Sequence, residues 1–288
     1  GAGGLSSGTR SGGRAGPLRR LWEDVRRTVA AENAAAAAGW TTPDRAADRR
    51  LLALVVIAAV SLLIMHYVAV GGAAHAGPLL RSIGFEELGG AVDAAFRDPR
   101  DGLFLVNMWW AAWIVFALFV LPAAFLVLSG RRLSGYGLTL GGGGHAAIYL
   151  ALFALMVPLV LLAATSPGFN SYYPFFRPPP GEPLWPRFFV FELAYLAQFV
   201  AVEFFFRGVL IHAARHRFGA WAILLPLLPY MMIHFGKPAG ETVGAVIAGA
   251  VLGYLSLRTG SIVYGVLLHA GVALTMDFAA LAMTGRLF

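Results

Sequence analysis

The C-terminal part of the chain places ionisable side chains, of types used in hydrolytic enzymes, within strongly apolar sequence. Glu203 and Arg207 are four residues apart, so in a helix both side chains lie on one face. Two histidines, His234 and His269, follow in separate apolar segments. Neutral imidazole binds metal ions and also transfers protons near neutral pH. Because ionisable groups inside a membrane are costly, they mark a functional site by default.

Glu203, His234 and His269 are the candidates for holding a divalent metal ion or a water molecule. The chain has no cysteine, so any metal ligand is His, Asp, Glu, Asn or water. A divalent ion in a partly dry cavity turns bound water into a strong nucleophile, and zinc suits nitrogen and oxygen ligands with one open position. The alternative is structural: each histidine hydrogen-bonds within the core, and Glu203 and Arg207 neutralise each other.

The segment that follows His234 is unusual for a membrane helix. Gly236 and Pro238 interrupt the helix, and Lys237, the only lysine of the chain, is followed by Glu241. We expect Lys237 and Glu241 at the lip of a polar cavity. The alternative is a loop at the membrane boundary with ordinary snorkelling charges.

Seven apolar segments must position these side chains. The chain has 288 residues, of which 58% are hydrophobic and only 13% are charged, which excludes a disordered chain and favours a membrane protein over an ordinary soluble domain. We predict an all-α polytopic membrane bundle of about seven transmembrane helices. Two of the segments, the fifth and the sixth, are short for a full crossing, so they are expected to be tilted, re-entrant or buried inside the bundle. The seven segments are 51–71, 104–129, 146–165, 188–211, 220–235, 243–257 and 261–281.

The N-terminal region divides into a tail and a basic helix. Residues 1–16 are rich in Gly, Ser, Ala and Arg, which predicts a flexible tail. Residues 17–50 are predicted to hold a basic amphipathic helix and a linker, and 51–288 to form the transmembrane domain. Pro17 suits the first helical turn, and apolar residues recur at helical spacing over 17–39. We expect this helix to lie on the membrane surface; the alternative is a solvated helix packed on the bundle.

The arginines predict the topology. Arginine pairs or clusters flank alternate ends of the predicted spans, whereas the first opposite loop, 72–103, holds three arginines against five acidic residues. This places the N-terminus in the cytoplasm and the C-terminus outside, in what we expect to be a bacterial inner (plasma) membrane. The net charge of +7 is therefore explained by membrane flanks, and we expect membrane lipid and no nucleic acid as a partner.

Residues 185–283 resemble the CPBP (Abi, CAAX prenyl protease 2-like) family of intramembrane metalloproteases. The resemblance rests on the order and spacing of several short motifs, each weak alone. The motifs are 202–208 (VEFFFRG), 230–234 (YMMIH), 253–262 (GYLSLRTGSI) and 267–269 (LLH).

The first family motif is Glu-Glu-x-x-x-Arg. Arg207 matches its arginine and Glu203 its second glutamate. The first glutamate, to which the family's water-activating role is assigned, falls on Val202. This departure leaves Glu203, or Glu241 reaching back from the interrupted helix, as the implied base.

The two remaining motifs supply the histidines. Phe-x-x-x-His is met by His234 with Tyr230 in place of Phe, and the third motif by His269. The family's polar residue four positions after that histidine, thought to support the oxyanion, is here Ala273. Lys237 is the substitute that could offer charge to an oxyanion.

The resemblance implies an intramembrane, metal-dependent endopeptidase that hydrolyses a peptide bond in or near the membrane. Its substrate would be a membrane-embedded or lipidated peptide or protein. The implied catalytic side chains are those of Glu203, Arg207, His234, Lys237, Glu241 and His269, with zinc held by His234, His269 and Glu203.

Two other functions remain open. The first is an inactive protein of the same fold that serves as a binding or structural subunit of a membrane complex, in keeping with Val202 and Ala273. The second is a small transporter or channel, which broken helices and midplane charges would fit, although no inverted repeat relates the two halves.

Overall fold

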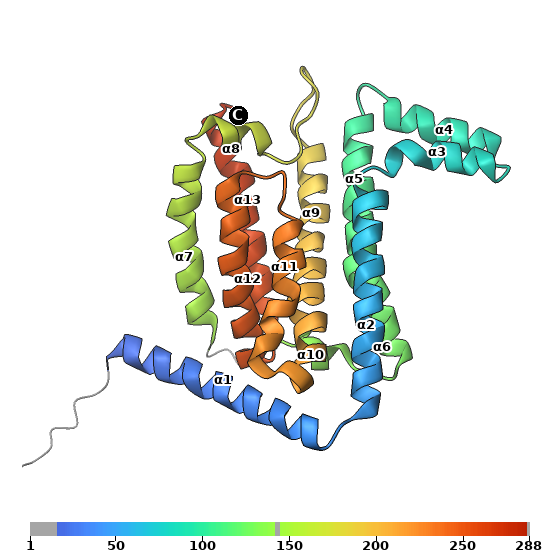
Figure 1. Ribbon diagram of the computed structural model, residues 1–288. Coiled ribbons are helices and arrows are strands. Elements are labelled where there is room, and N and C mark those ends of the chain that lie inside the picture. Colours follow the sequence, from blue (N-terminus) through green and yellow to red (C-terminus); the bar gives the residue numbers. More distant parts are fainter. Residues whose placement is uncertain (1–15, 142–144, 287–288) are drawn as a thin grey trace, which may run out of the picture.

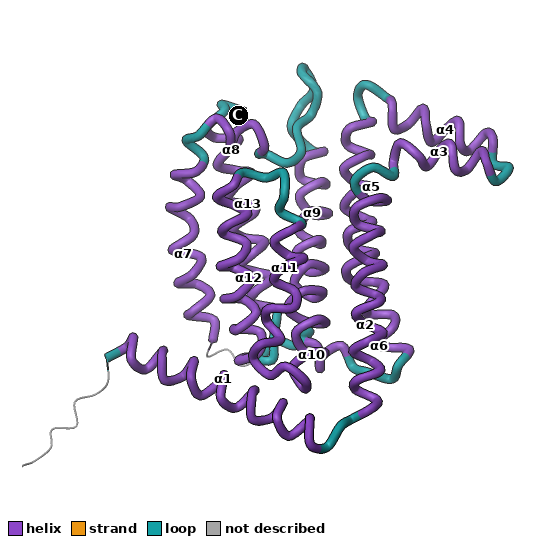
Figure 2. The backbone as a smooth tube through the Cα atoms, viewed as in Figure 1, coloured by secondary structure: helices purple, strands orange, loops and turns teal. Residues whose placement is uncertain are grey.

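The computed structural model describes residues 16–141 and 145–286, and in these ranges it contains helices and no strand (Figures 1 and 2). Six helices are long and apolar enough to cross a membrane. The predicted all-α membrane bundle is confirmed, and the chain is an integral membrane protein. Of the predicted N-terminal tail, residues 1–15 lie outside the described ranges.

The N-terminal half forms one side of the bundle. Helix α1 runs across the lower end in Figure 1, α2 rises from it, and α3 and α4 form a hairpin at the upper end. The segment α5–α6 then descends beside α2. The bounds are α1 Pro17–Thr41, α2 Arg45–Leu63, α3 Ala73–Ser82, α4 Glu86–Arg97, α5 Gly102–Val115 and α6 Leu121–Leu128, with π-helical turns η1 Ile64–Ala69 and η2 Phe116–Val120 and a 3-10 turn η3 Leu133–Tyr136.

The C-terminal half carries the predicted site residues. Helix α7 rises at the periphery, α9 descends through the centre, and α11, α12 and α13 cross beside it (Figure 1). The bounds are α7 Ala146–Ala163, α8 Pro167–Tyr172, α9 Arg187–Glu203, α10 Ile211–Phe218, α11 Leu224–Met232, α12 Ala239–Thr259 and α13 Val263–Met283, with the π-helical turn η5 Phe204–Leu210 and the 3-10 turn η6 Gly219–Ile223.

The six candidate spans and the seven predicted segments differ in the fourth and fifth. Residues 187–232 form one run of helical elements, but the chain reverses at Gly219, whose φ of 55° suits glycine. The returning α11 has only nine residues, in agreement with the short fifth segment. The sixth segment is longer than predicted: α12 has 21 residues, because the helix begins directly after Pro238 and includes polar residues that hydropathy alone excluded.

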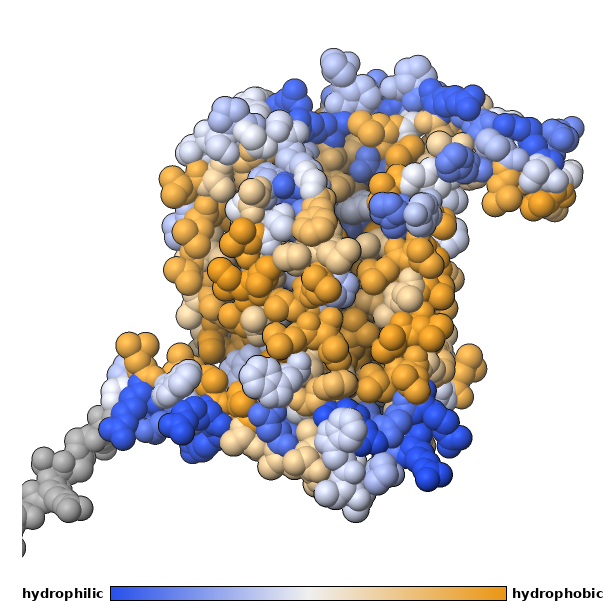
Figure 3. Space-filling view, in the orientation of Figure 1, coloured by the Kyte–Doolittle hydropathy of each residue, from blue (hydrophilic) through white to orange (hydrophobic). Residues whose placement is uncertain are grey.

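The loop predicted at 72–103 is a helical hairpin instead. Helices α3 and α4 pack closely because neither Gly77 nor Gly89 has a side chain: a Cβ on Gly89 would lie 2.6 Å from the Gly77 carbonyl oxygen. An ion pair of 2.7 Å between Arg81 and Asp93 closes the contact. Large apolar side chains point outward from the hairpin, and Figure 3 shows orange side chains on its lower side and blue ones above. The exposed large apolar side chains of this hairpin are Leu79, Ile83, Phe85 and Leu88.

Helix α1 packs on the lower end of the bundle. Asp24 pairs with Arg258 at 2.8 Å and Glu32 with Arg215 at 3.4 Å. The alternative of a helix packed on the body therefore holds for this side of α1. Leu18 and Trp22 on the same helix are exposed, so a membrane-surface contact stays a prediction.

Helix α9 and its continuation form the most buried candidate span. Within lipid, helices associate through close packing and hydrogen bonds rather than through the hydrophobic effect. Two buried serines illustrate this: Ser61 donates to the Ala117 carbonyl of η2 at 2.7 Å, and Ser256 to the Arg207 carbonyl of η5 at 3.1 Å. Gly208 lets η5 approach the Tyr136 carbonyl, which a Cβ would meet at 2.5 Å. These contacts fix the turn that carries the first candidate site residues.

Candidate active site

The predicted pair of Glu203 and Arg207 lies at the centre of the bundle, where α9 passes into η5. The Glu203 Oε1 and Arg207 Nη1 atoms are 3.2 Å apart, and the two side chains are only 1% and 2% exposed. A π-helical turn in an otherwise α-helical segment is frequently found at functional sites. The opposite charges compensate each other in a place that water does not reach.

His269 of α13 brings a second cation-forming group to the same carboxylate. Its Nδ1 lies 2.8 Å from Glu203 Oε1, although 66 residues separate the two in sequence. Because a carboxylate only accepts, Nδ1 of His269 carries a proton, and in the neutral ring Nε2 is then the nitrogen with the lone pair. The His269 side chain is 20% exposed, which makes it the accessible member of this cluster. Its ring also packs at 4.6 Å from that of Phe199.

Tyr230 of α11 connects this cluster with the second histidine. The Arg207 guanidinium carbon lies 3.7 Å from the centre of the Tyr230 ring, a cation–π contact. The same ring meets His234 at 4.8 Å and His269 at 6.4 Å between centroids. The two histidines thus converge on Tyr230.

His234 is held by its own backbone surroundings. Its Nδ1 donates to the Tyr230 carbonyl oxygen at 2.8 Å, which leaves Nε2 as an acceptor. The Thr242 hydroxyl of α12 donates to the His234 carbonyl at 2.9 Å, tying α12 to the end of α11. The ring orientation of His234 is therefore fixed, and the side chain is buried.

Lys237 and Glu241 form a separate cluster next to His234. Lys237 Nζ lies 2.6 Å from one Glu241 oxygen, and the Tyr173 hydroxyl donates to the other at 2.6 Å. Burial raises the pKa of the Tyr173 phenol, so this hydroxyl stays protonated. Since both Glu241 oxygens have partners, Glu203 beside His269 is the better placed carboxylate for hydrolytic chemistry.

The described residues do not complete a metal site. No group of three or more His, Asp or Glu side chains gathers around one point in the described ranges. A hydrolytic zinc ion has three protein ligands and one open position. His234 and His269 each retain one unprotonated nitrogen, but the nearest Glu203 oxygen is already shared by Arg207 and His269. We therefore derive no step through a metal ion.

The two departures from the family motifs lie in apolar surroundings. Val202 packs against a cluster that contains Phe205 and Phe206, and Ala273 is 5% exposed within a cluster formed with Phe199 and Tyr195. The water-activating and oxyanion-supporting groups that the resemblance implied at these positions are thus absent from the packing.

Sequence reasoning missed the contact of Tyr173 with Glu241 and that of Asp277 with the Phe175 amide. Tyr173 directly follows α8, outside the residues that the sequence analysis singled out, yet its hydroxyl donates to Glu241. Glu192 of α9 and Asp277 of α13 are both buried, and Asp277 accepts from the Phe175 amide at 3.0 Å. The 102-residue separation of that last pair leaves no local signal.

Two aromatic side chains of the second predicted span pack against other parts of the chain. Trp109 Nε1 donates to the Val68 carbonyl at 2.8 Å, and Trp110 stacks on Phe175 at 4.7 Å. Both are partly buried against other helices of this chain. Packing within the chain therefore accounts for these two rings.

Comparison with known proteins adds one family match. Residues 183–275 match the family model described as type II CAAX prenyl endopeptidase Rce1-like. This range contains Glu203, Arg207, His234 and His269, and it agrees with the resemblance read from the motifs. No curated protein and no solved structure matched the chain.

Proposed function

Because residues 183–275 match the family model of Rce1-like type II CAAX prenyl endopeptidases, we propose that this chain is a membrane-embedded endopeptidase. The observation that carries the proposal is the hydrogen bond between the accessible His269 and the buried Glu203. A carboxylate that orients an imidazole is the arrangement used to activate a nucleophile in many hydrolases.

In the proposed reaction, a water molecule donates to the free Nε2 of His269. The imidazole takes the proton as the water oxygen attacks the peptide carbonyl, and Glu203 stabilises the imidazolium that forms. His269 then returns the proton to the leaving amine nitrogen as the C–N bond breaks. Arg207 is a positioning residue, since it keeps Glu203 ionised and pins its orientation through a buried ion pair.

The hydrogen bonds and ring contacts of the other predicted site residues indicate their roles. Nε2 of His234 can accept from the same water or from substrate across the Tyr230 ring. Lys237 and Glu241 satisfy each other, so we assign them to holding the segment between α11 and α12 and to contacting substrate, not to taking the proton. The proposed substrate is a membrane-embedded or lipidated peptide, which would reach the site through the lipid.

The test uses the full chain in liposomes with a peptide that ends in a prenylated cysteine and three further residues. Release of the C-terminal tripeptide is followed by mass spectrometry. Glu203→Gln and His269→Ala should each lower the rate by about 10²- to 10⁴-fold, the usual contribution of acid–base catalysis. Glu192→Gln is the matched control, because it makes the same change on the same helix, and it should retain activity.

If Glu203→Gln lowers the rate no more than Glu192→Gln does, the roles assigned to His269 as the base and to Glu203 as its orienting carboxylate are wrong. Absence of release by the wild type above the protein-free blank would remove the CAAX-type activity on this peptide.

A second function is favoured by Val202 and Ala273, whose side chains offer no chemistry where the family has polar groups. In that case the chain is a binding or structural subunit of a membrane complex. Cross-linking in native membranes, followed by purification of the chain, then yields a stoichiometric partner, while peptide release stays at the blank level.

Zinc stays a prediction from the sequence, with elemental analysis as its test. Wild-type protein, never exposed to chelator, is compared with His234→Ala/His269→Ala. About one zinc per chain that disappears in the double variant would support a metal enzyme. Equal absence from both would leave the water-based reaction above as the proposal.

A further inference from the structure

A polar pocket of ≈ 650 Å³ opens at the lower end of the bundle, on the arginine-rich side. It lies between the start of α2, the turn that follows α6, and α10, all of which are at the bottom of Figure 1. The candidate active site does not extend into it: no predicted site residue lines the pocket.

The lining of this pocket is strongly basic. Four arginines contribute to it, from three separate elements: Arg50, Arg131, Arg132 and Arg215. Two histidines, His212 and His216, add further nitrogen atoms, and Asp44 is the only acidic residue of the lining.

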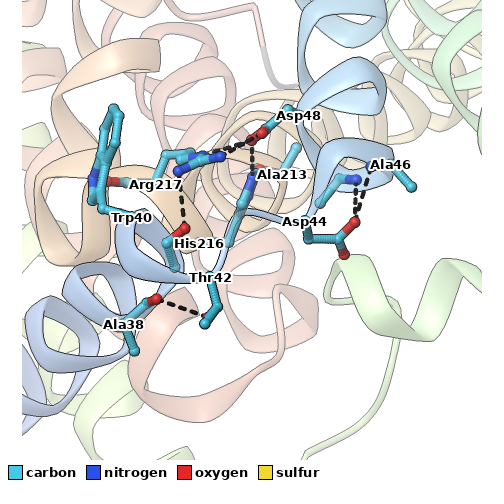
Figure 4. A network of polar contacts seen from close by, with 11 residues as sticks. Ala38, Trp40, Thr42, Asp44, Ala46, Asp48, Ala213, His216 and Arg217 are labelled. Atoms are coloured by element: carbon cyan, nitrogen blue, oxygen red, sulfur yellow. Dashed lines mark hydrogen bonds and ion pairs between the residues drawn. The ribbon is translucent and has the colours of Figure 1, made fainter.

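The nearby carboxylates are already engaged. Asp44 caps α2, where one of its oxygens accepts from the Ala46 and Ala47 amides at 2.9 and 3.0 Å. The hydrogen bond from the Ala47 amide holds the pKa of Asp44 below its usual value. Asp48 accepts from Arg217 Nε at 2.6 Å and faces His216 Nε2 at 3.1 Å (Figure 4). Asp48 is therefore engaged by Arg217 and His216, and Asp44, which also lies near Arg50, is a single carboxylate against the four arginines of the pocket.

Arg131 and Arg132 have no counter-charge within the described residues. Their guanidinium groups form no ion pair or hydrogen bond there, whereas Arg215 is paired with Glu32 at 3.4 Å. Adjacent unpaired arginines facing a cavity repel each other unless an anion is bound, and the planar guanidinium matches the geometry of phosphate oxygens.

The wall of the pocket continues into the apolar surface of the bundle. Leu51 lines the pocket and begins the apolar face of α2. Beyond it, α2 and α6 carry exposed apolar side chains. They are Leu52, Val55, Val56, Val127 and Leu128. A ligand with an anionic head and acyl chains would meet a basic pocket and then an apolar surface.

We propose that this pocket binds the phosphate group of an anionic phospholipid from the bilayer leaflet on the arginine-rich side. The arginines contact the phosphate oxygens, and the acyl chains lie along α2 and α6. Basic pockets at the ends of membrane helices are known to select anionic headgroups. Bound there, the lipid would link α2, α6 and α10, and the last of these is continuous with η5 of the candidate active site.

The test compares lipid binding to the full chain in phosphatidylcholine nanodiscs that contain graded amounts of phosphatidylglycerol, read by native mass spectrometry. The pocket variant is Arg50→Gln/Arg131→Gln/Arg132→Gln. The charge-matched control is Arg26→Gln/Arg45→Gln/Arg49→Gln, which removes three exposed arginines from α1 and α2 that do not line the pocket. Each pocket arginine should contribute about fivefold, so the pocket variant should bind phosphatidylglycerol about 100-fold more weakly and the control within a few-fold of wild type.

If the pocket variant and the control lose the same affinity for phosphatidylglycerol, the binding depends on general surface charge and the proposal is overturned. The same thermal midpoint for all three proteins in pure phosphatidylcholine excludes misfolding as the cause. Glycerol 3-phosphate in solution is the second arm: it carries the phosphate without acyl chains. If it binds the wild type as tightly as phosphatidylglycerol does, the ligand is a soluble phosphate compound and the lipid assignment is wrong.

Discussion

At the scale of single residues, the candidate site depends on one buried carboxylate with an ion-paired arginine and a hydrogen-bonded histidine. Glu203 is 1% exposed, and both Arg207 and His269 lie within 3.2 Å of its Oε1 atom. A charge this deep is tolerated only when it is paired and hydrogen-bonded. The same pairing that allows Glu203 to exist there also orients His269 toward whatever occupies the accessible side.

Arg207→Met tests how strongly the pair is coupled. We expect the unfolding free energy to fall by about 3–5 kcal/mol, because Glu203 then keeps a buried charge without its main partner. Unfolding in mixed micelles, followed by circular dichroism, measures the change. Arg19→Met is the control, since Arg19 and Glu23 have the same four-residue spacing but are exposed; its unfolding midpoint should not change. Similar midpoints for the two variants would contradict a buried, energetically coupled pair.

At the scale of elements, two parts of the fold are positioned by glycines that allow two backbone segments to approach closely. Gly208 lets η5 reach the turn at Tyr136, and Gly77 and Gly89 let α3 and α4 pack into a hairpin. The sequence contains 35 glycines, and nothing local distinguishes these from the others. Only the approach of a second backbone gives them their role.

Gly89→Ala and Gly90→Ala form a matched pair on α4. A Cβ on Gly89 would lie 2.6 Å from the Gly77 carbonyl oxygen, whereas a Cβ on Gly90 meets nothing within 4 Å. Both changes raise helix propensity equally. We therefore expect faster amide hydrogen exchange over 73–97 in Gly89→Ala and unchanged or slower exchange in Gly90→Ala. Equal exchange in the two variants would mean that the hairpin is not held by this contact.

At the scale of the whole molecule, an apolar belt separates two polar ends (Figure 3). The described chain begins at the arginine-rich end and finishes at the opposite end, as Figure 1 shows for α1 and the C-terminus. Six helices of the described residues are long and apolar enough to cross this belt, and α11 has only nine residues. The arginine distribution predicts that the end that carries α1 faces the cytoplasm.

Cysteine labelling in intact bacterial cells tests this orientation, and the cysteine-free chain needs no background changes. Ser82→Cys is on the hairpin end and Ser129→Cys on the arginine-rich end, and both positions are exposed. A membrane-impermeant maleimide should label Ser82→Cys in intact cells and Ser129→Cys only after the membrane is opened. The reverse pattern would invert the predicted topology.

The sequence by itself determined the long membrane helices and the resemblance of the C-terminal part to a family of membrane proteases. Apolar runs of about 20 residues predict spans because only a helix satisfies its own backbone in lipid. The spacing of Glu203 and Arg207 likewise predicts their contact, because neighbours four apart share a helix face.

Only the tertiary structure decided which distant groups meet. Glu203 and His269 are 66 residues apart, and Tyr173 and Glu241 are 68 apart. The arginine pocket joins residues from α2, from the turn after α6 and from α10, and the hairpin of α3 and α4 replaced a predicted loop. Helical periodicity specifies neighbours on one helix, but which faces pack together depends on glycine contacts, interhelical hydrogen bonds and buried ion pairs, and these form only when the whole bundle is assembled.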